Sequence, residues 1–150
     1  MAQAQTKKAG SRLIRIDIDD IQDVWDEAVY LLKPAIRLND GFEPADVLDA
    51  LMHSRMNLWL AVEDGELVGA AVTEIINYPQ KRSVFILFAG GRVEENWPAY
   101  YETMANYAMT LNADCIETIS RPGLAKLLKA QSPDVLTYMR FNVSQDQAGR

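Results

Sequence analysis

The stretch "VFILFAGGRVEENWPAYYETM", from Val84 to Met104, decides the fold because it joins an apolar run to an amphipathic helix. The run "KRSVFILFAG" is apolar at nearly every position, which predicts a strand buried on both faces. From Trp97 the apolar residues recur at helical spacing, with Asn96 as a candidate cap. Gly90 and Gly91 stand between the two. Such a junction can receive the phosphate groups of a cofactor.

Before this stretch, the pattern predicts a strand, two helices and a hairpin. "RLIRIDI", residues 12–18, alternates as a strand, and Asp19 or Asp20 is expected to cap the helix that follows. Pro34 should kink or end that helix, and a shorter one follows over residues 47–52. Two apolar runs then meet at Asp64-Gly65, a pair suited to a tight hairpin turn.

After this stretch, three shorter elements are expected. "CIETI" predicts a strand, and "SRPGLAKLLKAQ" predicts a helix begun by Ser120. "DVLTYMRFNV", residues 134–143, alternates as a last strand. We therefore expect one domain over residues 12–143, with a polar tail at 1–11 and another at 144–150.

Composition limits the possible partners and compartments. The chain has 150 residues and a net charge of −6, so the whole surface repels nucleic acid. The N-terminus "MAQAQTKKAGSR" lacks the apolar core of a signal peptide, and no stretch is long enough for a membrane span, so we expect no membrane partner and a cytoplasmic location. Cys115 is the only cysteine and reads as a small apolar residue, and His53, the only histidine, as a helix-surface residue. A metal site is not expected.

The order of elements resembles the GNAT N-acetyltransferase superfamily over about residues 12–143. The hairpin "LWLAVEDGELVGAAV" and the later "ANYAMTLNADCIETIS" carry the resemblance. With "YP", "AG" and "RPG", the chain is similar to short acetyltransferase-like proteins of bacteriophages. The resemblance implies a mixed α+β fold whose central, mostly antiparallel sheet has about six to seven strands and about four flanking helices.

The resemblance also implies an acetyl-CoA site where the apolar strand splays from its neighbour. It assigns cofactor contacts to Phe88, Ala89, Gly90, Gly91 and Arg92, and to Arg121 at the last helix. In this chain the glycines precede the arginine, unlike the phosphate loop of the family, and Glu94 and Glu95 follow it. Acids in a first helical turn also favour the helix dipole, so helix capping is the alternative interpretation of this loop.

Amine acetylation implies a base and an acid near the thioester. Glu74 is the candidate base, and Tyr101 and Tyr138 are candidate acids. The alternatives are a solvated Glu74 and two tyrosines that belong to the core.

The resemblance implies one of two functions. One is acetyl transfer from acetyl-CoA to an amine of a small molecule or a protein. The other is a catalytically inactive protein of the same fold, serving as a structural or accessory component of a phage particle or another assembly, and thus located in the virion.

Overall fold

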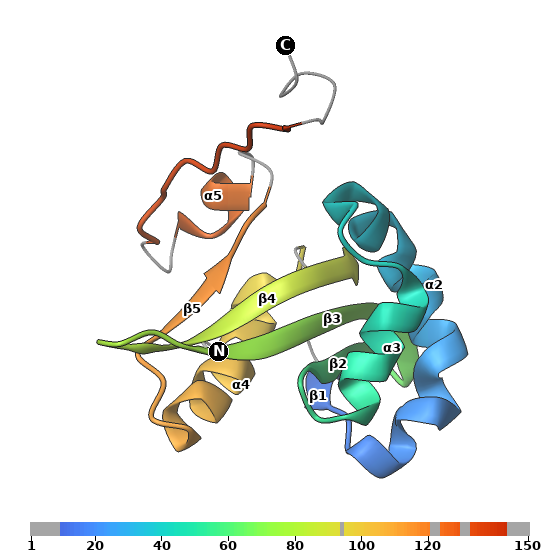
Figure 1. Ribbon diagram of the computed structural model, residues 1–150. Helices are drawn as coiled ribbons and strands as arrows, with labels where there is room; N and C mark the ends of the chain where they lie inside the picture. Colours follow the sequence, from blue (N-terminus) through green and yellow to red (C-terminus); the bar gives the residue numbers. More distant parts are fainter. Residues whose placement is uncertain (1–9, 94, 121–123, 130–132, 144–150) are drawn as a thin grey trace, which may run out of the picture.

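The computed structural model describes residues 10–93, 95–120, 124–129 and 133–143. Its described part contains one five-stranded sheet, in the order β1-β2-β3-β4-β5. The sheet is antiparallel except for the last pair, β4 and β5. Figure 1 shows α2 and α3 on one side of the sheet and α4 on the other. The mixed α+β class with a mostly antiparallel sheet is thus confirmed, with five strands instead of six or seven.

The first half of the chain forms one edge of the sheet and the helices that cover one face. Its elements are β1 (Ser11–Arg15), the short 3-10 helix η1 (Ile18–Asp20), α2 (Ile21–Asn39) and α3 (Pro44–Met52). Asp20 precedes α2 but makes no side-chain cap. The helix also runs through Pro34 to Asn39, so Pro34 does not end it. Burial of Leu32 and Ile36 on either side of the proline holds the helix in place despite the missing N–H donor.

The β2–β3 hairpin confirms the turn expected from the sequence. β2 (Asn57–Glu63) and β3 (Glu66–Asn77) are joined by Asp64 and Gly65. Both residues have positive φ angles, 50° and 83°. Type I′ turns need this backbone conformation, and it matches the twist of the two strands.

The second half of the chain completes the sheet and supplies the opposite helical layer. It contains β4 (Arg82–Gly91), α4 (Trp97–Thr110), β5 (Cys115–Thr118) and the one-turn helix α5 (Leu124–Leu127). The helix expected from Ser120 is therefore present only as this turn, and residues 121–123 and 130–132 lie outside the described part.

Two apolar clusters fill the space between the layers. One packs α2 and α3 on the sheet and includes Trp25, Leu32, Val72 and Phe88. The other packs α4 on the opposite face and includes Trp59, Ile86, Trp97 and Tyr100. Trp25, Trp59 and Trp97 are each less than one-tenth exposed. Aromatic side chains therefore contribute to the core on both faces of the sheet.

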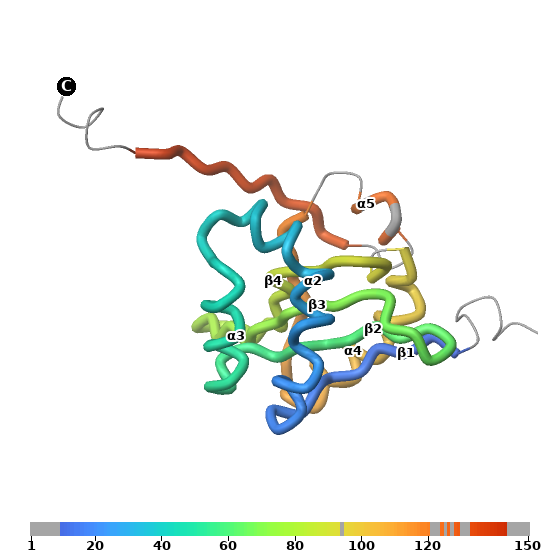
Figure 2. Tube along the Cα trace, turned by 90° about the vertical axis from the view of Figure 1, so that its right-hand side faces the viewer, coloured from blue at the N-terminus to red at the C-terminus, as the bar shows by residue number. Residues whose placement is uncertain are grey.

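The strand predicted over residues 134–143 is wrong. This segment has no regular secondary structure, and every residue from 133 to 143 is exposed. In Figures 1 and 2 it runs as an extended chain apart from the sheet. The alternating sequence suits a strand, but a strand also needs hydrogen-bonding neighbours, and among the described residues this segment pairs with none of the five strands.

Candidate functional site

The sheet opens between β4 and β5. The two parallel strands pair only from Ser83 with Cys115 to Ile86 with Thr118. Beyond Ile86, residues 88–91 of β4 pair with β3 alone within the described residues. The Thr118 hydroxyl donates to the carbonyl of Ile86 at 3.0 Å and closes the narrow end of the opening. We call this opening the wedge, defined by residues 87–91 of β4 and the end of β5 at Thr118.

A β-bulge lies where the wedge begins. Val72 of β3 is opposite Phe88, whereas the next residue, Thr73, is opposite Ile86. Leu87 is therefore an extra residue in β4. A bulge of this kind bends the strand and locally increases its twist. It also reverses the alternation, because Ile86 belongs to the α4-side cluster and Phe88 to the α2-side cluster.

The residues assigned to the cofactor strand have structural tasks of their own. Phe88 is buried and meets Phe42 edge to face, with ring centroids 5.5 Å apart. Ala89 is half-buried and packs on the α4-side cluster. Only the main chain of these two residues is thus available for a ligand in the wedge.

The two glycines are explained by close packing of the backbone. A Cβ on Gly90 would lie 1.9 Å from the carbonyl oxygen of Leu31 in α2. Gly91 has φ of 69°, and a Cβ there would lie 2.3 Å from the carbonyl oxygen of Val68. Real side chains do not tolerate such distances. The absence of a side chain at Gly90 lets α2 pack against β4, and the positive φ of Gly91 lets the chain turn at the end of β4.

Arg92 is held next to a buried carboxylate. Its backbone N–H donates to the carbonyl of Val68 at 2.9 Å, and its Nη1 lies 3.4 Å from Oε2 of Glu63. Glu63, at the end of β2, is 6% exposed and also accepts from the side-chain amide of Asn96 and from the Tyr100 hydroxyl, at 3.5 Å for the latter. Burial, with the nearby Glu63 charge, raises the pKa of Tyr100, although its contact with Asn96 acts in the opposite direction.

The carboxylate of Glu63, from a distant part of the sequence, therefore lies at the start of α4. Asn96 occupies the cap position but gives its side-chain amide to Glu63 and makes no side-chain cap. Glu95 is exposed, and Glu94 lies outside the described residues. Glu63, more than 30 residues earlier, contacts the side chains of Asn96 and Tyr100 at the start of this helix. The sequence analysis missed this residue because only the tertiary fold brings it to α4.

The three candidate catalytic residues lie in three different layers. Glu74 is half-buried on β3 and shares the α2-side face with Val72. Tyr101 is 37% exposed on α4, where its ring meets that of Trp97. Tyr138 is 61% exposed in the extended segment. The fold does not gather them around one point, and Arg121 lies outside the described residues.

A second carboxylate lies beside the narrow end of the wedge. Phe85 of β4 pairs with Glu117 of β5 on one side and with Glu74 of β3 on the other. The three side chains form a row on the α2-side face, one residue before the β4–β5 pairing ends. The sequence analysis missed Glu117. The indication in the sequence was a single acid within the short predicted strand "CIETI".

The environment of Glu117 keeps it ionised. The Ser83 hydroxyl, followed by the Tyr78 hydroxyl and the Lys81 charge, holds the pKa of Glu117 below its usual value, against an opposing contribution from burial. Tyr78 donates to Glu117 at 2.9 Å. That bond, with the adjacent negative charge, raises the pKa of Tyr78. The pair is thus a carboxylate and a protonated phenol in contact.

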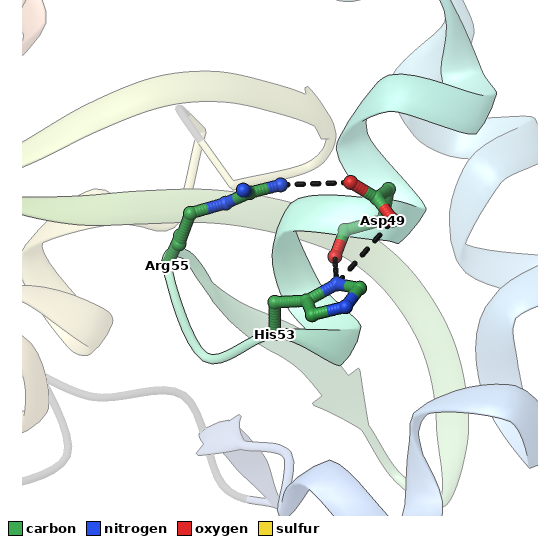
Figure 3. A network of polar contacts seen from close by, with 3 residues as sticks. All are labelled: Asp49, His53 and Arg55. Atoms are coloured by element: carbon green, nitrogen blue, oxygen red, sulfur yellow. Dashed lines mark hydrogen bonds and ion pairs between the residues drawn. The ribbon is translucent and has the colours of Figure 1, made fainter.

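His53 belongs to a surface network on α3 (Figure 3). Its Nδ1 lies 2.8 Å from the carbonyl oxygen and 3.3 Å from a carboxylate oxygen of Asp49, and Arg55 reaches the other carboxylate oxygen at 2.8 Å. All three side chains are more than half exposed. Such pairs contribute little energy. His53 is thus a helix-surface residue, as expected.

Other features of the described residues do not compete with the wedge. A hollow of about 160 Å³ lies at the opposite edge of the sheet, between the end of β1 and the α3–β2 connection. Pockets for small molecules usually exceed about 300 Å³, so this one is too small for a cofactor the size of acetyl-CoA. In the described part of the chain, no cluster of histidine, cysteine and acidic residues could hold a metal ion. Nor is any described helix long and apolar enough to cross a membrane.

Solved structures with this fold include acetyltransferases. The sequence matches no family model and no curated protein. A predicted acetyltransferase from Clostridium acetobutylicum, solved with acetyl-CoA, matches 88% of this chain and 96% of its own at 14% identity and a TM-score of 0.58. An aminoglycoside acetyltransferase from an uncultured soil metagenomic sample, in complex with sisomicin, matches 90% and 97% at 9% identity and a TM-score of 0.65. An integron cassette protein from the mobile metagenome of V. cholerae matches 89% and 93% at 18% identity and a TM-score of 0.59. The chain therefore has the GNAT fold.

Proposed function

We propose that this protein transfers an acetyl group from acetyl-CoA to an amine. The observation that carries the proposal is the wedge, where the β4–β5 pairing ends after Ile86 and a bulge interrupts the β3–β4 ladder at Leu87. Unpaired main-chain groups of residues 87–91 can hydrogen-bond an extended amide-containing ligand as a neighbouring strand would. The fold shared with an acetyltransferase solved with acetyl-CoA supports the same ligand.

Arg92 is the residue we assign to the phosphates. Its side chain is 58% exposed and its Nη1 lies 3.4 Å from Glu63, so it can contact a ligand while it remains close to that carboxylate. A guanidinium has five N–H donors, which allows two anionic partners. The backbone around Gly90 and Gly91 completes the phosphate end of the proposed site, and Arg121 is the further candidate there.

Transfer forms a bond from the amine nitrogen to the acetyl carbon and breaks the bond from that carbon to sulfur. An ammonium acceptor first loses one proton to become the attacking amine. The amine then loses a second proton as it becomes the amide, and the thiolate gains one. We assign the row beside the wedge to the amine: Glu117 and Glu74 attract its ammonium form and accept its proton, directly or through water. Tyr78 remains protonated next to Glu117 and is a proton donor that the sequence analysis did not propose. Tyr101 and Tyr138 remain candidates for protonating the thiolate.

Titration calorimetry with acetyl-CoA tests the binding half of the proposal. We expect saturable binding that Arg92→Gln weakens about tenfold, the size of one charged contact. Arg55→Gln removes the same charge from the connection between α3 and β2 and should leave the affinity unchanged. An absence of binding at millimolar acetyl-CoA, in protein shown to be folded by circular dichroism, would refute the proposal.

Release of free thiol in the presence of amines tests the chemical half. Glu117→Gln should slow release with little change in acetyl-CoA affinity, because the amide cannot accept the proton. Glu102→Gln, on the exposed surface of α4, is the matched control. Equal rates for both variants would remove Glu117 from the proposed chemistry.

No observation favours the inactive phage component. The neighbours named above include two acetyltransferases and no virion protein. We propose a small-molecule amine as acceptor, because the soil protein of this fold was solved with the aminoglycoside sisomicin. A reaction on soluble acetyl-CoA also agrees with the expected cytoplasmic location.

A further inference from the structure

The segment 133–143 exposes more apolar surface than any other described stretch of the chain. Six large apolar side chains in eleven residues are each at least 61% exposed: Val135, Leu136, Tyr138, Met139, Phe141 and Val143. Isolated exposed apolar residues are ordinary, but a contiguous group marks an interaction surface. The segment passes over the molecule in the direction of α2 (Figure 2), where Arg140 binds both carboxylate oxygens of Asp40 at 3.0 and 3.4 Å.

The sequence of this segment is suited to pairing with itself in the antiparallel sense. Reading outward from Thr137, the residues on the two sides are Leu136 and Tyr138, then Val135 and Met139, then Asp134 and Arg140. If two copies meet about a two-fold axis at Thr137, each of these residues lies opposite its counterpart from the other copy. Every apolar residue then faces an apolar residue, and Asp134 faces an arginine.

We propose that two copies of this chain associate through residues 134–140, paired as antiparallel strands about a two-fold axis at Thr137. The pairing supplies the hydrogen-bonding neighbour that the segment lacks in a single copy. It also creates two symmetry-related ion pairs between Asp134 and Arg140 of the other copy. Opposite charges directly across an antiparallel pair are favourable, whereas like charges are unfavourable.

The charge of residues 134–140 differs from that of the chain as a whole. The chain carries a net charge of −6, so most surfaces of one copy repel the same surfaces of another. Residues 134–140 contain one acid and one base and are neutral together. Arg140 can serve both carboxylates, because its contacts with Asp40 leave part of its five-donor fork available.

The paired residues supply part of the area that an association of this kind needs. Tyr138 offers roughly 150 Å² or more, as an aromatic side chain. Val135, Leu136, Met139 and the backbone add to this, compared with about 800 Å² per partner in a standard interface.

Charge exchange across the two-fold axis tests this arrangement by sedimentation over a concentration series. Wild type should dimerise, and Asp134→Arg or Arg140→Asp alone should weaken the dimer at least about tenfold, since both symmetry-related pairs become repulsive. An equimolar mixture of the two variants should regain the association as a heterodimer, because each arginine then meets an aspartate. Asp40→Asn removes the contact within the chain and should leave the dimer intact.

Disulfide cross-linking at the two-fold axis is a second, independent test of the dimer. In a Cys115→Ser background, Thr137→Cys should form a disulfide between copies under mild oxidation, because residue 137 meets itself. Leu38→Cys is the exposed control and should cross-link far less. A wild type that stays monomeric at all concentrations would overturn the proposal. So would a dimer whose stability ignores the charge exchange, because a different surface would then hold it.

Discussion

Replacing Gly90 with alanine separates two explanations of the glycine pair at the end of β4. If the glycine exists to admit a cofactor phosphate, alanine should reduce ligand affinity and leave the fold intact. The structure assigns it another task, because the added Cβ would lie 1.9 Å from the carbonyl oxygen and 2.8 Å from the carbonyl carbon of Leu31. Both atoms are main chain in the middle of α2, so a rotamer change cannot relieve the clash.

The expected cost follows from that distance. A carbon needs more than 3 Å from such an oxygen, so β4 and α2 must separate by over 1 Å. Forcing an extra methyl group into a packed site costs about 1–3 kcal/mol or more, and we expect the upper end here because both sides are backbone. A loss of about 3 kcal/mol lowers the melting temperature by roughly 6–12 °C in a chain of this size.

Urea unfolding followed by circular dichroism measures this loss. Gly41→Ala is the matched control, because its Cβ would meet only the Asn39 side chain, 2.9 Å away, which can move. The control should unfold within about 0.5 kcal/mol of wild type, as most surface changes do. If Gly90→Ala were equally stable, with an unchanged denaturant slope, the packing argument would be refuted and the glycine would be free for a ligand role.

Two further predictions concern polar contacts. Tyr78→Phe removes a hydrogen bond to Glu117 and should raise the pKa of that carboxyl. The pKa of Glu117 is lowered in the folded state, so its carboxylate stabilises the fold at pH values above its unfolded-state pKa, and this stabilisation is lost as the pH falls through the folded-state pKa. The loss should therefore occur at higher pH in the variant than in wild type. The pH titration of the Glu117 carboxyl carbon by NMR checks both the direction and the window. Trp59→Phe removes the buried donor to the Thr73 hydroxyl, at 2.9 Å, and should cost about 1–3 kcal/mol in urea unfolding. A smaller loss for this variant than for the exposed Tyr30→Phe would contradict the assignment.

Local rules predicted the parts of the fold that local chemistry determines. Asp64-Gly65 specified its turn because few other residue pairs adopt positive φ at both positions. The course of α2 past Pro34 was not predictable from the same rules, since burial of Leu32 and Ile36 outweighs the missing hydrogen bond. The alternation over residues 134–143 was a correct indication of strand-forming chemistry. It could not supply a partner strand, and without one the segment stays extended and unpaired.

The candidate site shows the same division. The wedge was expected at the end of β4, where the described strands do separate. Its cause was hidden, because a run that is apolar at nearly every position gives no sign of where its alternation reverses at Leu87. Glu63 and Glu117 reach the site across large separations in sequence, and neither stands in a recognisable motif. Arg92 was identified from the sequence, but its carboxylate neighbour was not.

In the proposed function, the bulge at Leu87 makes ligand binding in the wedge depend on the length of β4 as well as on its side chains. Deleting that single residue would place Phe88 directly after Ile86 in the ladder and allow uninterrupted pairing with β3. If β5 then paired with β4 beyond Ile86, the space between the two strands would close. A one-residue deletion would in that case abolish the proposed ligand site without any substitution in the loop that follows.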